Sequence, residues 1–145
     1  MRKYLVTLIV LALPIQSMAG WHVTKTLGGK EVAFFSGSNF GGYTAEMNQY
    51  GSIVLHSVVR DACNTMKNNR LAIYNGYEMV VETKTFQYNS ECRIIINPVK
   101  FEDFMYIRGQ LKRASEIMVA LAGMKGKIDS SGYTEAMQII KFKKS

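Results

Sequence analysis

The sequence is poor in the residues from which most catalytic and metal centres are built. It contains two cysteines and two histidines in 145 residues. It has no G-x-G-x-x-G or G-K-[ST] pattern for phosphates, no H-E-x-x-H pattern for zinc and no G-x-S-x-G nucleophile elbow. We therefore expect no cofactor and no metal, and the sequence favours a non-enzymatic function over an enzymatic one.

The one long apolar run of the chain lies near its N-terminus and is too short to cross a bilayer. It covers residues 4–13, whereas a membrane-spanning helix needs roughly 20 apolar residues. The run follows Arg2 and Lys3 and precedes the small residues Ser17 and Ala19. This order of a charged start, a short apolar run and small residues is typical of a secretory signal peptide. We expect cleavage after Ala19.

Cleavage divides the chain into a signal peptide, residues 1–19, and a single β-rich domain, residues 20–145. That length suits one domain with a modest core. No transmembrane segment is expected after cleavage, and the expected location is the periplasm or the extracellular medium.

The chain is basic, but it has no run of basic residues. Its formal net charge is +7 before cleavage, and nowhere do four cations follow one another. A nucleic-acid-binding surface needs a basic stripe interleaved with aromatic rings, so no nucleic-acid partner is expected. The expected partner is an envelope protein or an anionic envelope polymer, which the excess of cations would suit. The alternative is that these cations only form a solvated surface that keeps the protein soluble.

Cys63 and Cys92 are the two cysteines, and both belong to the mature domain. An even pair in an oxidising compartment predicts one structural disulfide. Neither cysteine belongs to a C-x-x-C pair, so a redox-active dithiol is not expected.

Short β-prone segments separated by turn residues run along most of the domain. The clearest signal is Asn75-Gly76 between residues 71–74 and 77–84, because Asn-Gly supplies the positive φ angles of a tight hairpin turn. A second hairpin is expected over 21–36, around Gly28-Gly29. Further strands are expected at 52–59, 92–96, 117–121 and 124–128, with loops at 36–43 and 60–69.

Two short helices are expected late in the chain. One begins at Asn97-Pro98, with the proline at the first helical position, and the other covers 133–141. The pattern predicts a mostly-β (α+β) fold. It is a small antiparallel β-sandwich or barrel with one or two short C-terminal helices and one disulfide.

The histidines offer the only route to an enzymatic function. His56, Ser57 and Asp61 are close in sequence, but neighbours along a strand point to opposite faces, so they do not form a triad. Neither His22 nor His56 has a second ligand at metal-binding spacing. The enzymatic alternative is therefore a small hydrolase that uses His56 with a nearby acid.

Tyr74, Asn75, Gly76 and Tyr77 form the best candidate for a contact surface. Tyrosine is enriched at interfaces because it is a rigid apolar plate with a polar tip. Both rings flank the tight turn, where they can stand clear of the sheet. The alternative is that both rings lie flat on the core.

The end of the chain carries a weak likeness to a known family. Residues 126–137 read G-K-I-D-S-S-G-Y-T-E-A-M, a strand running into a helix, and follow the segment 111–121 and one upstream cysteine pair. This arrangement resembles the invasion-associated locus B-like β-sandwich proteins of Gram-negative envelopes. The resemblance implies a β-sandwich located in the envelope and carries over no binding residue. The second cysteine pair of that pattern is absent here.

The leading hypothesis is a non-enzymatic periplasmic or secreted binding or accessory protein, such as an inhibitor, an immunity-type factor or an envelope-machine component. One alternative is a small hydrolase or toxin that acts on the envelope. The other is a structural subunit of a secretion or conjugation apparatus.

Overall fold

The computed structural model describes residues 20–26, 28–57 and 63–144. The expected signal peptide therefore lies outside the described residues. The strands are β1 (Gly20–Lys25), β2 (Glu31–Phe40), β3 (Tyr43–Asn48), β4 (Ile53–Ser57), β5 (Met66–Tyr74), β6 (Tyr77–Tyr88), β7 (Glu91–Pro98), β8 (Glu116–Leu121) and β9 (Met124–Asp129). The helices are α2 (Phe101–Arg113) and α3 (Tyr133–Lys144).

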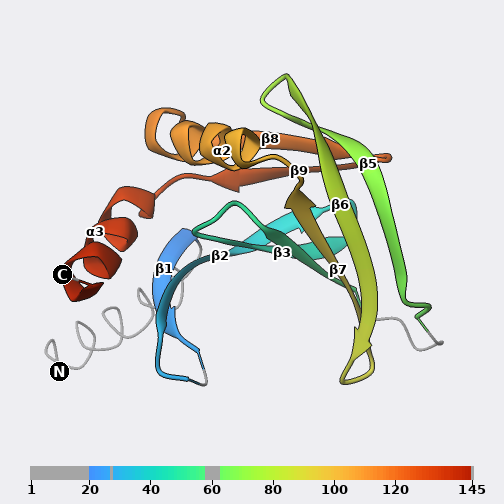
Figure 1. Cartoon of the computed structure of the whole chain (residues 1–145), viewed down its shortest axis with the longest axis horizontal. Helices are drawn as coiled ribbons and strands as arrows, with labels where there is room; N and C mark the ends of the chain where they lie inside the picture. The colour runs from blue at the N-terminus through green and yellow to red at the C-terminus, as the bar shows by residue number, and fades with distance from the viewer. Residues whose placement is uncertain (1–19, 27, 58–62, 145) are drawn as a thin grey trace, which may run out of the picture.

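The strands form one antiparallel sheet that curls into a barrel (Figure 1). Their order is β1-β2-β3-β4-β7-β6-β5-β8-β9, and a further pairing between β2 and β9 closes eight of them into a ring. β1 lies outside that ring and pairs with the first half of β2. The predicted mostly-β fold is confirmed, and the barrel is the alternative that the chain adopts.

A glycine makes the closure of the barrel possible. Gly126 of β9 lies opposite Phe40 of β2. A Cβ atom at Gly126 would lie 2.1 Å from the Cδ2 atom of Phe40, so the ring occupies the space that any other side chain would need. Close by, the Ser38 hydroxyl donates a hydrogen bond to the carbonyl of Lys127. The seam between β2 and β9 therefore rests on the packing of the Phe40 ring against Gly126, the backbone pairing of these two residues and the hydrogen bond from Ser38.

The expectation of a loop at 36–43 is wrong, because β2 continues to Phe40 and a tight turn connects it to β3. The pairing of β2 with β3 shifts register between Phe35 and Ser38. Gly37 has a φ of 95°, a conformation that glycine reaches without strain. The glycine-rich composition thus marks a β-bulge inside a strand rather than a loop.

The Asn-Gly hairpin is confirmed and is longer than predicted. β5 and β6 pair from Met66 opposite Thr85 up to Tyr74 opposite Tyr77. The first residues of β5 lie inside the loop expected at 60–69, so that expectation is wrong there. The apolar alternation of a strand is missing in 66–70 because the inward side chains of this stretch face an opening rather than the packed core.

The first helix begins later than predicted. α2 starts at Phe101 after Lys100, whereas Pro98 is the last residue of β7, lies opposite Val81 and is buried. Proline is tolerated here because the neighbouring Val99 N–H donates to the carbonyl of Val80, and the pairing of β7 with β4 on the other side ends at Ile96. The second helix begins at Tyr133, as predicted.

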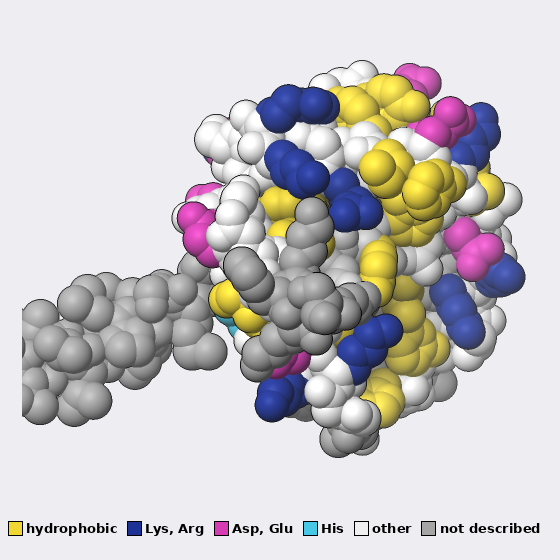
Figure 2. Space-filling model, turned by 60° about the vertical axis from the view of Figure 1, so that its left-hand side comes forward, with side chains coloured by type: hydrophobic (Ala, Val, Ile, Leu, Met, Phe, Trp, Pro, Cys, Tyr) yellow, Lys and Arg dark blue, Asp and Glu magenta, His cyan; other side chains and the backbone are white. Residues whose placement is uncertain are grey.

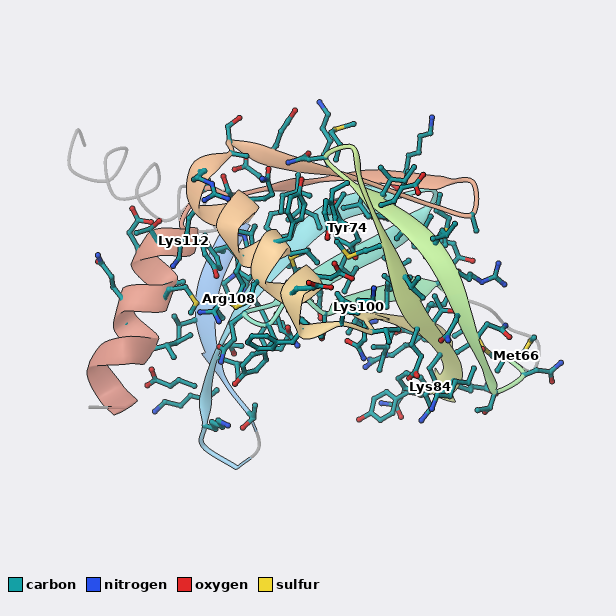
Figure 3. All side chains as sticks on the ribbon, turned by 45° about the horizontal axis from the view of Figure 1, so that its top comes forward. Met66, Tyr74, Lys84, Lys100, Arg108 and Lys112 are labelled. Carbon is teal, nitrogen blue, oxygen red and sulfur yellow. A yellow bond between two sulfur atoms is a disulfide. The ribbon has the colours of Figure 1, made fainter. Side chains whose placement is uncertain are left out.

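α2 covers one end of the barrel. Its buried residues include Ile107 and Leu111, and Ile107 lies within 3.3 Å of the position of a Cβ atom at Gly51 in the β3–β4 turn. The Tyr106 hydroxyl donates to the carbonyl of Tyr74, 3.3 Å away. Figure 3 shows Tyr74 close to α2 and Met66 at the far end of the same strand. One end of the barrel is therefore plugged by a helix.

α3 packs on the outside of the barrel, against β1 and β2. The Trp21 ring lies edge-on to the Tyr133 ring, with 5.1 Å between centroids, and tilted against Phe35 at 5.9 Å. All three residues are buried. Neither described helix has the length and apolar content to cross a membrane.

The predicted disulfide is confirmed, and it lies at the uncovered end of the barrel. Cys63 is bonded to Cys92, with 5.6 Å between their Cα atoms. Cys63 lies three residues before the start of β5, and Cys92 is the second residue of β7. The bridge ties the segment before β5 to the start of β7.

We expect Gly126→Ala to destabilise the domain by about 1–3 kcal/mol or more, because the added methyl overlaps a packed ring. Gly28→Ala is the matched control, since the nearest atom to its Cβ position is 3.9 Å away. Urea denaturation measures both variants. Recovery of stability when Phe40→Leu is added to Gly126→Ala would confirm the cause, and an unchanged midpoint for Gly126→Ala would contradict it.

Replacing both cysteines with serine removes the constraint on the unfolded chain. With a sequence separation of 29 between the cysteines, the loop-entropy relation gives a loss of about 3.5 kcal/mol. Urea denaturation of Cys63→Ser/Cys92→Ser beside the oxidised parent measures it. Equal free energies of unfolding would show that the bridge has no structural role.

Candidate functional site

A cavity of about 370 Å³ opens at the end of the barrel opposite α2. We call it the mouth cavity. Its lining comes from the inner faces of β3, β5, β6 and β7 and from the β8–β9 turn. The lining residues are Tyr43, Met66, Asn68, Arg70, Thr83, Thr85, Ile94, Leu121, Ala122 and Met124.

The registers of the strands explain why these residues share one space. Even-numbered residues of β5 face inward, as the complete burial of Ala72 and Tyr74 shows. Arg70, Asn68 and Met66 continue this row toward the uncovered end. The described pairings of β5 with β8 run only from Ala72 to Tyr74. From Arg70 back to Met66, β5 therefore extends beyond the end of β8, and the mouth cavity lies on the inner side of this extension.

The polar groups of the mouth cavity are not equivalent. The Thr83 hydroxyl donates to the carbonyl of Asn68 at 3.2 Å, and the Thr85 hydroxyl donates to the carbonyl of Asn64 at 2.9 Å. Arg70 is the one charged side chain in the lining. Among the described residues it has no ion-pair partner. Its guanidinium is therefore the one charged group of the described lining that remains to bind a ligand.

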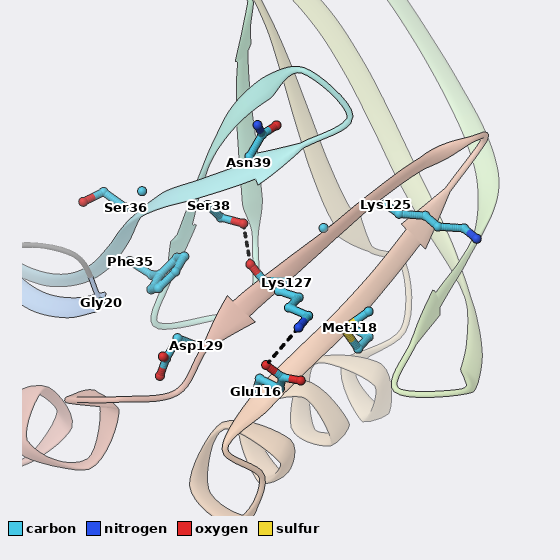
Figure 4. Close-up of a pocket in the computed structure, with 12 residues that line it drawn as sticks. Gly20, Phe35, Ser36, Ser38, Asn39, Glu116, Met118, Lys125, Lys127 and Asp129 are labelled. Atoms are coloured by element: carbon cyan, nitrogen blue, oxygen red, sulfur yellow. Dashed lines mark hydrogen bonds and ion pairs between the residues drawn. The ribbon is translucent and has the colours of Figure 1, made fainter.

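A second concavity, of about 600 Å³, lies on the outside of the barrel along the seam between β2 and β9 (Figure 4). We call it the seam groove. Of its four charged groups, Lys127 lies 3.8 Å from Glu116, and Asp129 accepts the backbone N–H of Ser131 at 2.6 Å. The fourth, Lys125, has no ion-pair partner among the described residues. Each concavity therefore holds one cation without an ion-pair partner, but the seam groove also contains two carboxylates, whereas the described lining of the mouth cavity contains none.

His56 lies on the outer face of the barrel between two carboxylates. Its Nε2 is 3.4 Å from Oε2 of Glu46, and its Nδ1 is 3.9 Å from Oε2 of Glu91. The neighbouring Ser57 alternates to the other face of β4, and Asp61 lies outside the described residues. Neither the mouth cavity nor the seam groove includes His56. The structure thus brings acids to this histidine but gives them no concave site.

His22 and the remaining acids do not form a metal centre. His22 Nδ1 lies 3.3 Å from the carbonyl oxygen of Gly20. Within residues 20–26, 28–57 and 63–144, no group of three or more His, Cys, Asp or Glu side chains could hold a metal ion.

The hairpin tip proposed as a contact surface is docked onto α2. Asn75 donates from Nδ2 to Oε1 of Gln110 at 2.9 Å, and its Oδ1 accepts the backbone N–H of Met118 at 2.8 Å. Asn75 has a φ of 49° and Gly76 a φ of 81°, as the tight turn requires. The tip is therefore held by a helix and a strand at once.

The two tyrosines of the tip have different surroundings. Tyr74 is fully buried, so its ring does not stand clear of the sheet, and this burial raises its pKa. Tyr77 is 39% exposed and stacks on Tyr106 at 4.1 Å between centroids. Its hydroxyl donates to Oδ1 of Asp103 at 3.0 Å. This hydrogen bond raises the pKa of Tyr77, because a carboxylate favours the neutral phenol. Recognition through the tip stays a prediction.

Cationic side chains do not gather into one stripe on the face that Figure 2 shows. Lys and Arg side chains are spread over it, with hydrophobic and acidic side chains between them. A dispersed positive charge differs from the continuous basic stripe of a nucleic-acid interface.

No family model matches the chain, and no curated protein or solved structure is significantly similar to it. The resemblance to the locus B-like envelope proteins therefore stays an expectation. The site has to be interpreted from its own geometry.

The mouth cavity was not foreseen from the sequence. One signal for it was available: Met66, Asn68 and Arg70 are in phase with the buried Ala72 and Tyr74 across a hairpin whose register the Asn-Gly turn fixes. Polar residues in phase with buried residues of the same strand indicate that this part of the strand extends beyond the packed core.

We expect Tyr74→Ala to cost about 3–5 kcal/mol of stability, as for other large aromatic residues removed from a core. Tyr77→Ala is the control on the other side of the turn and should cost less, since its ring is partly solvated. Urea denaturation measures both. Equal losses would contradict the difference in burial.

Proposed function

We propose that this chain is a non-enzymatic binding protein of the periplasm or the extracellular medium, and that it binds a small ligand in the mouth cavity. The observation that carries the proposal is the asymmetry of the barrel. α2 plugs one end, and at the other end the inner face continues into a cavity with one unpaired charge. The interior of an eight-stranded barrel is wide enough to hold one small ligand.

The surroundings of the cavity support a binding role rather than catalysis. Its lining combines apolar side chains with a few polar groups, the usual composition of a ligand site. Its described lining contains no histidine, cysteine or carboxylate, so its hydroxyl groups have no neighbouring general base to activate them as nucleophiles. The disulfide is compatible with an oxidising compartment. In the hydrolase alternative the catalytic residue would be His56, which lies on the outer face of the barrel and not in the mouth cavity.

A second candidate is binding of an envelope protein, which the exposed apolar side chains near α2 favour. Leu71, Val99 and Phe101 are 63%, 54% and 77% exposed. Binding of an envelope protein that Phe101→Ser abolishes and Asn68→Trp leaves intact would favour this candidate over the mouth cavity.

We expect Asn68→Trp to abolish ligand binding, because the indole would fill the mouth cavity. Asn69→Trp is the matched control: the neighbouring residue faces outward on β5 and is exposed. The mature protein is screened against a small-molecule library by thermal shift, and hits are tested by calorimetry.

The proposal holds if hits bind the parent and Asn69→Trp but not Asn68→Trp, with both variants folded by circular dichroism. It fails if Asn68→Trp binds every hit as the parent does, or if the library yields no hit. Hydrolysis of an envelope polymer that is lost in His56→Ala would replace it with the enzymatic alternative.

A further inference from the structure

We propose that the mouth cavity takes an amphipathic monoanion, an apolar chain that ends in a carboxylate or another singly charged acid, and that Arg70 binds the acid group. This inference rests on the proposed function and names the ligand class of the same site.

The charge of the lining points to an anion. Arg70 is exposed at the rim on the inner row of β5, and no acidic side chain lines the cavity among the described residues. The nearby Lys67 faces outward and is compensated by Glu82, with 3.5 Å between Nζ and Oε2. Arg70 has no such partner among the described residues. A guanidinium presents parallel N–H donors that match the two oxygens of a carboxylate.

The remaining lining points to an apolar body. Met66, Ile94, Leu121 and Met124 contribute apolar surface. Two of these four are methionines, whose flexible thioethers adapt to chains of different shape. The volume of about 370 Å³ lies near the small end of ligand pockets, which span about 300–1,000 Å³. A single chain suits this space better than a bulky lipid.

The hydrogen bonds of the threonines disfavour a polyhydroxylated ligand such as a glycan. Thr83 and Thr85 already donate their hydroxyl protons to carbonyls of the 64–68 segment. Few donors besides Arg70 then remain in the cavity, and a sugar with many hydroxyls would leave groups unpaired, which costs affinity. A ligand with one acid group and an apolar chain needs one cationic partner and an apolar lining, and the cavity provides both.

The test compares three probes of equal chain length by isothermal titration calorimetry. They are dodecanoate, dodecyl sulfate and the uncharged methyl ester of dodecanoate. Carboxylate and sulfate share the single negative charge, so the pair shows whether the charge or the carboxylate geometry is recognised. Octanoate and hexadecanoate then measure the length that the cavity accepts.

Three variants separate the role of Arg70 from structural effects. Arg70→Gln removes the charge inside the cavity, and Arg70→Lys keeps it without the planar fork. Lys84→Gln removes one charge from the outer face of β6, where Lys84 is exposed (Figure 3). Thermal unfolding confirms that each variant folds.

We expect both anions to bind the parent and Lys84→Gln equally, and Arg70→Gln about tenfold more weakly. Added salt should weaken binding of the anions to the parent but not to Arg70→Gln. The methyl ester should bind the parent and all three variants as weakly as the anions bind Arg70→Gln. Arg70→Lys should keep the salt dependence.

Failure of the inference can be told apart from failure of the proposed function. If the ester binds as tightly as the acid, or if Arg70→Gln and Lys84→Gln behave alike, the inference is overturned. If Asn68→Trp still abolishes that binding, the mouth cavity remains the site. If no anion binds the parent, the inference also fails, and the library screen decides the proposed function alone.

Discussion

The whole barrel depends on the packing of the Phe40 ring against the backbone of Gly126. Strand pairing alone would leave an open, curled sheet, since β2 and β9 share a single paired position. The ring fills the space that a side chain on β9 would take, and the Ser38 hydroxyl adds a link beside it. Closure brings the inner faces of all eight strands together, and it thereby creates both the core and the cavity at its open end.

The strand order gives the two ends of the barrel different characters. Because β5, β6 and β7 are inserted in reverse order between β4 and β8, the long hairpin extends past β8 at one end and reaches α2 at the other. At the α2 end, Asn75 and Tyr77 are held by Gln110 and Asp103. At the other end, Arg70 overhangs open space. The β5–β6 hairpin therefore contacts α2 at one end of the barrel and lines the mouth cavity at the other.

Local signals predicted most strands, the second helix and the disulfide, because turn residues and paired cysteines act over short distances. They failed where distant contacts decide. The segment 36–43 is rich in glycine, yet packing of Phe40 against β9 makes it a strand. The tyrosines of the Asn-Gly turn were recognised, but the burial of Tyr74 depends on closure of the barrel and on the packing of α2 beside it. The phase of Arg70 with Ala72 was the one local signal for the mouth cavity, but the end of the β5–β8 pairing at Ala72 depends on contacts between distant segments.

The reversed order of β5, β6 and β7 also has a consequence for the time course of folding. These three strands are consecutive and joined by tight turns, so they can pair with little loss of loop entropy. Pairing of β4 with β7 and of β2 with β9 joins residues far apart in sequence, and such contacts form slowly. We therefore expect the β5–β6–β7 unit to form before the ring closes, with its edges still unpaired. Lys67 and Arg70 on its β5 edge are charged residues of the kind that disfavour pairing of an exposed strand with other copies.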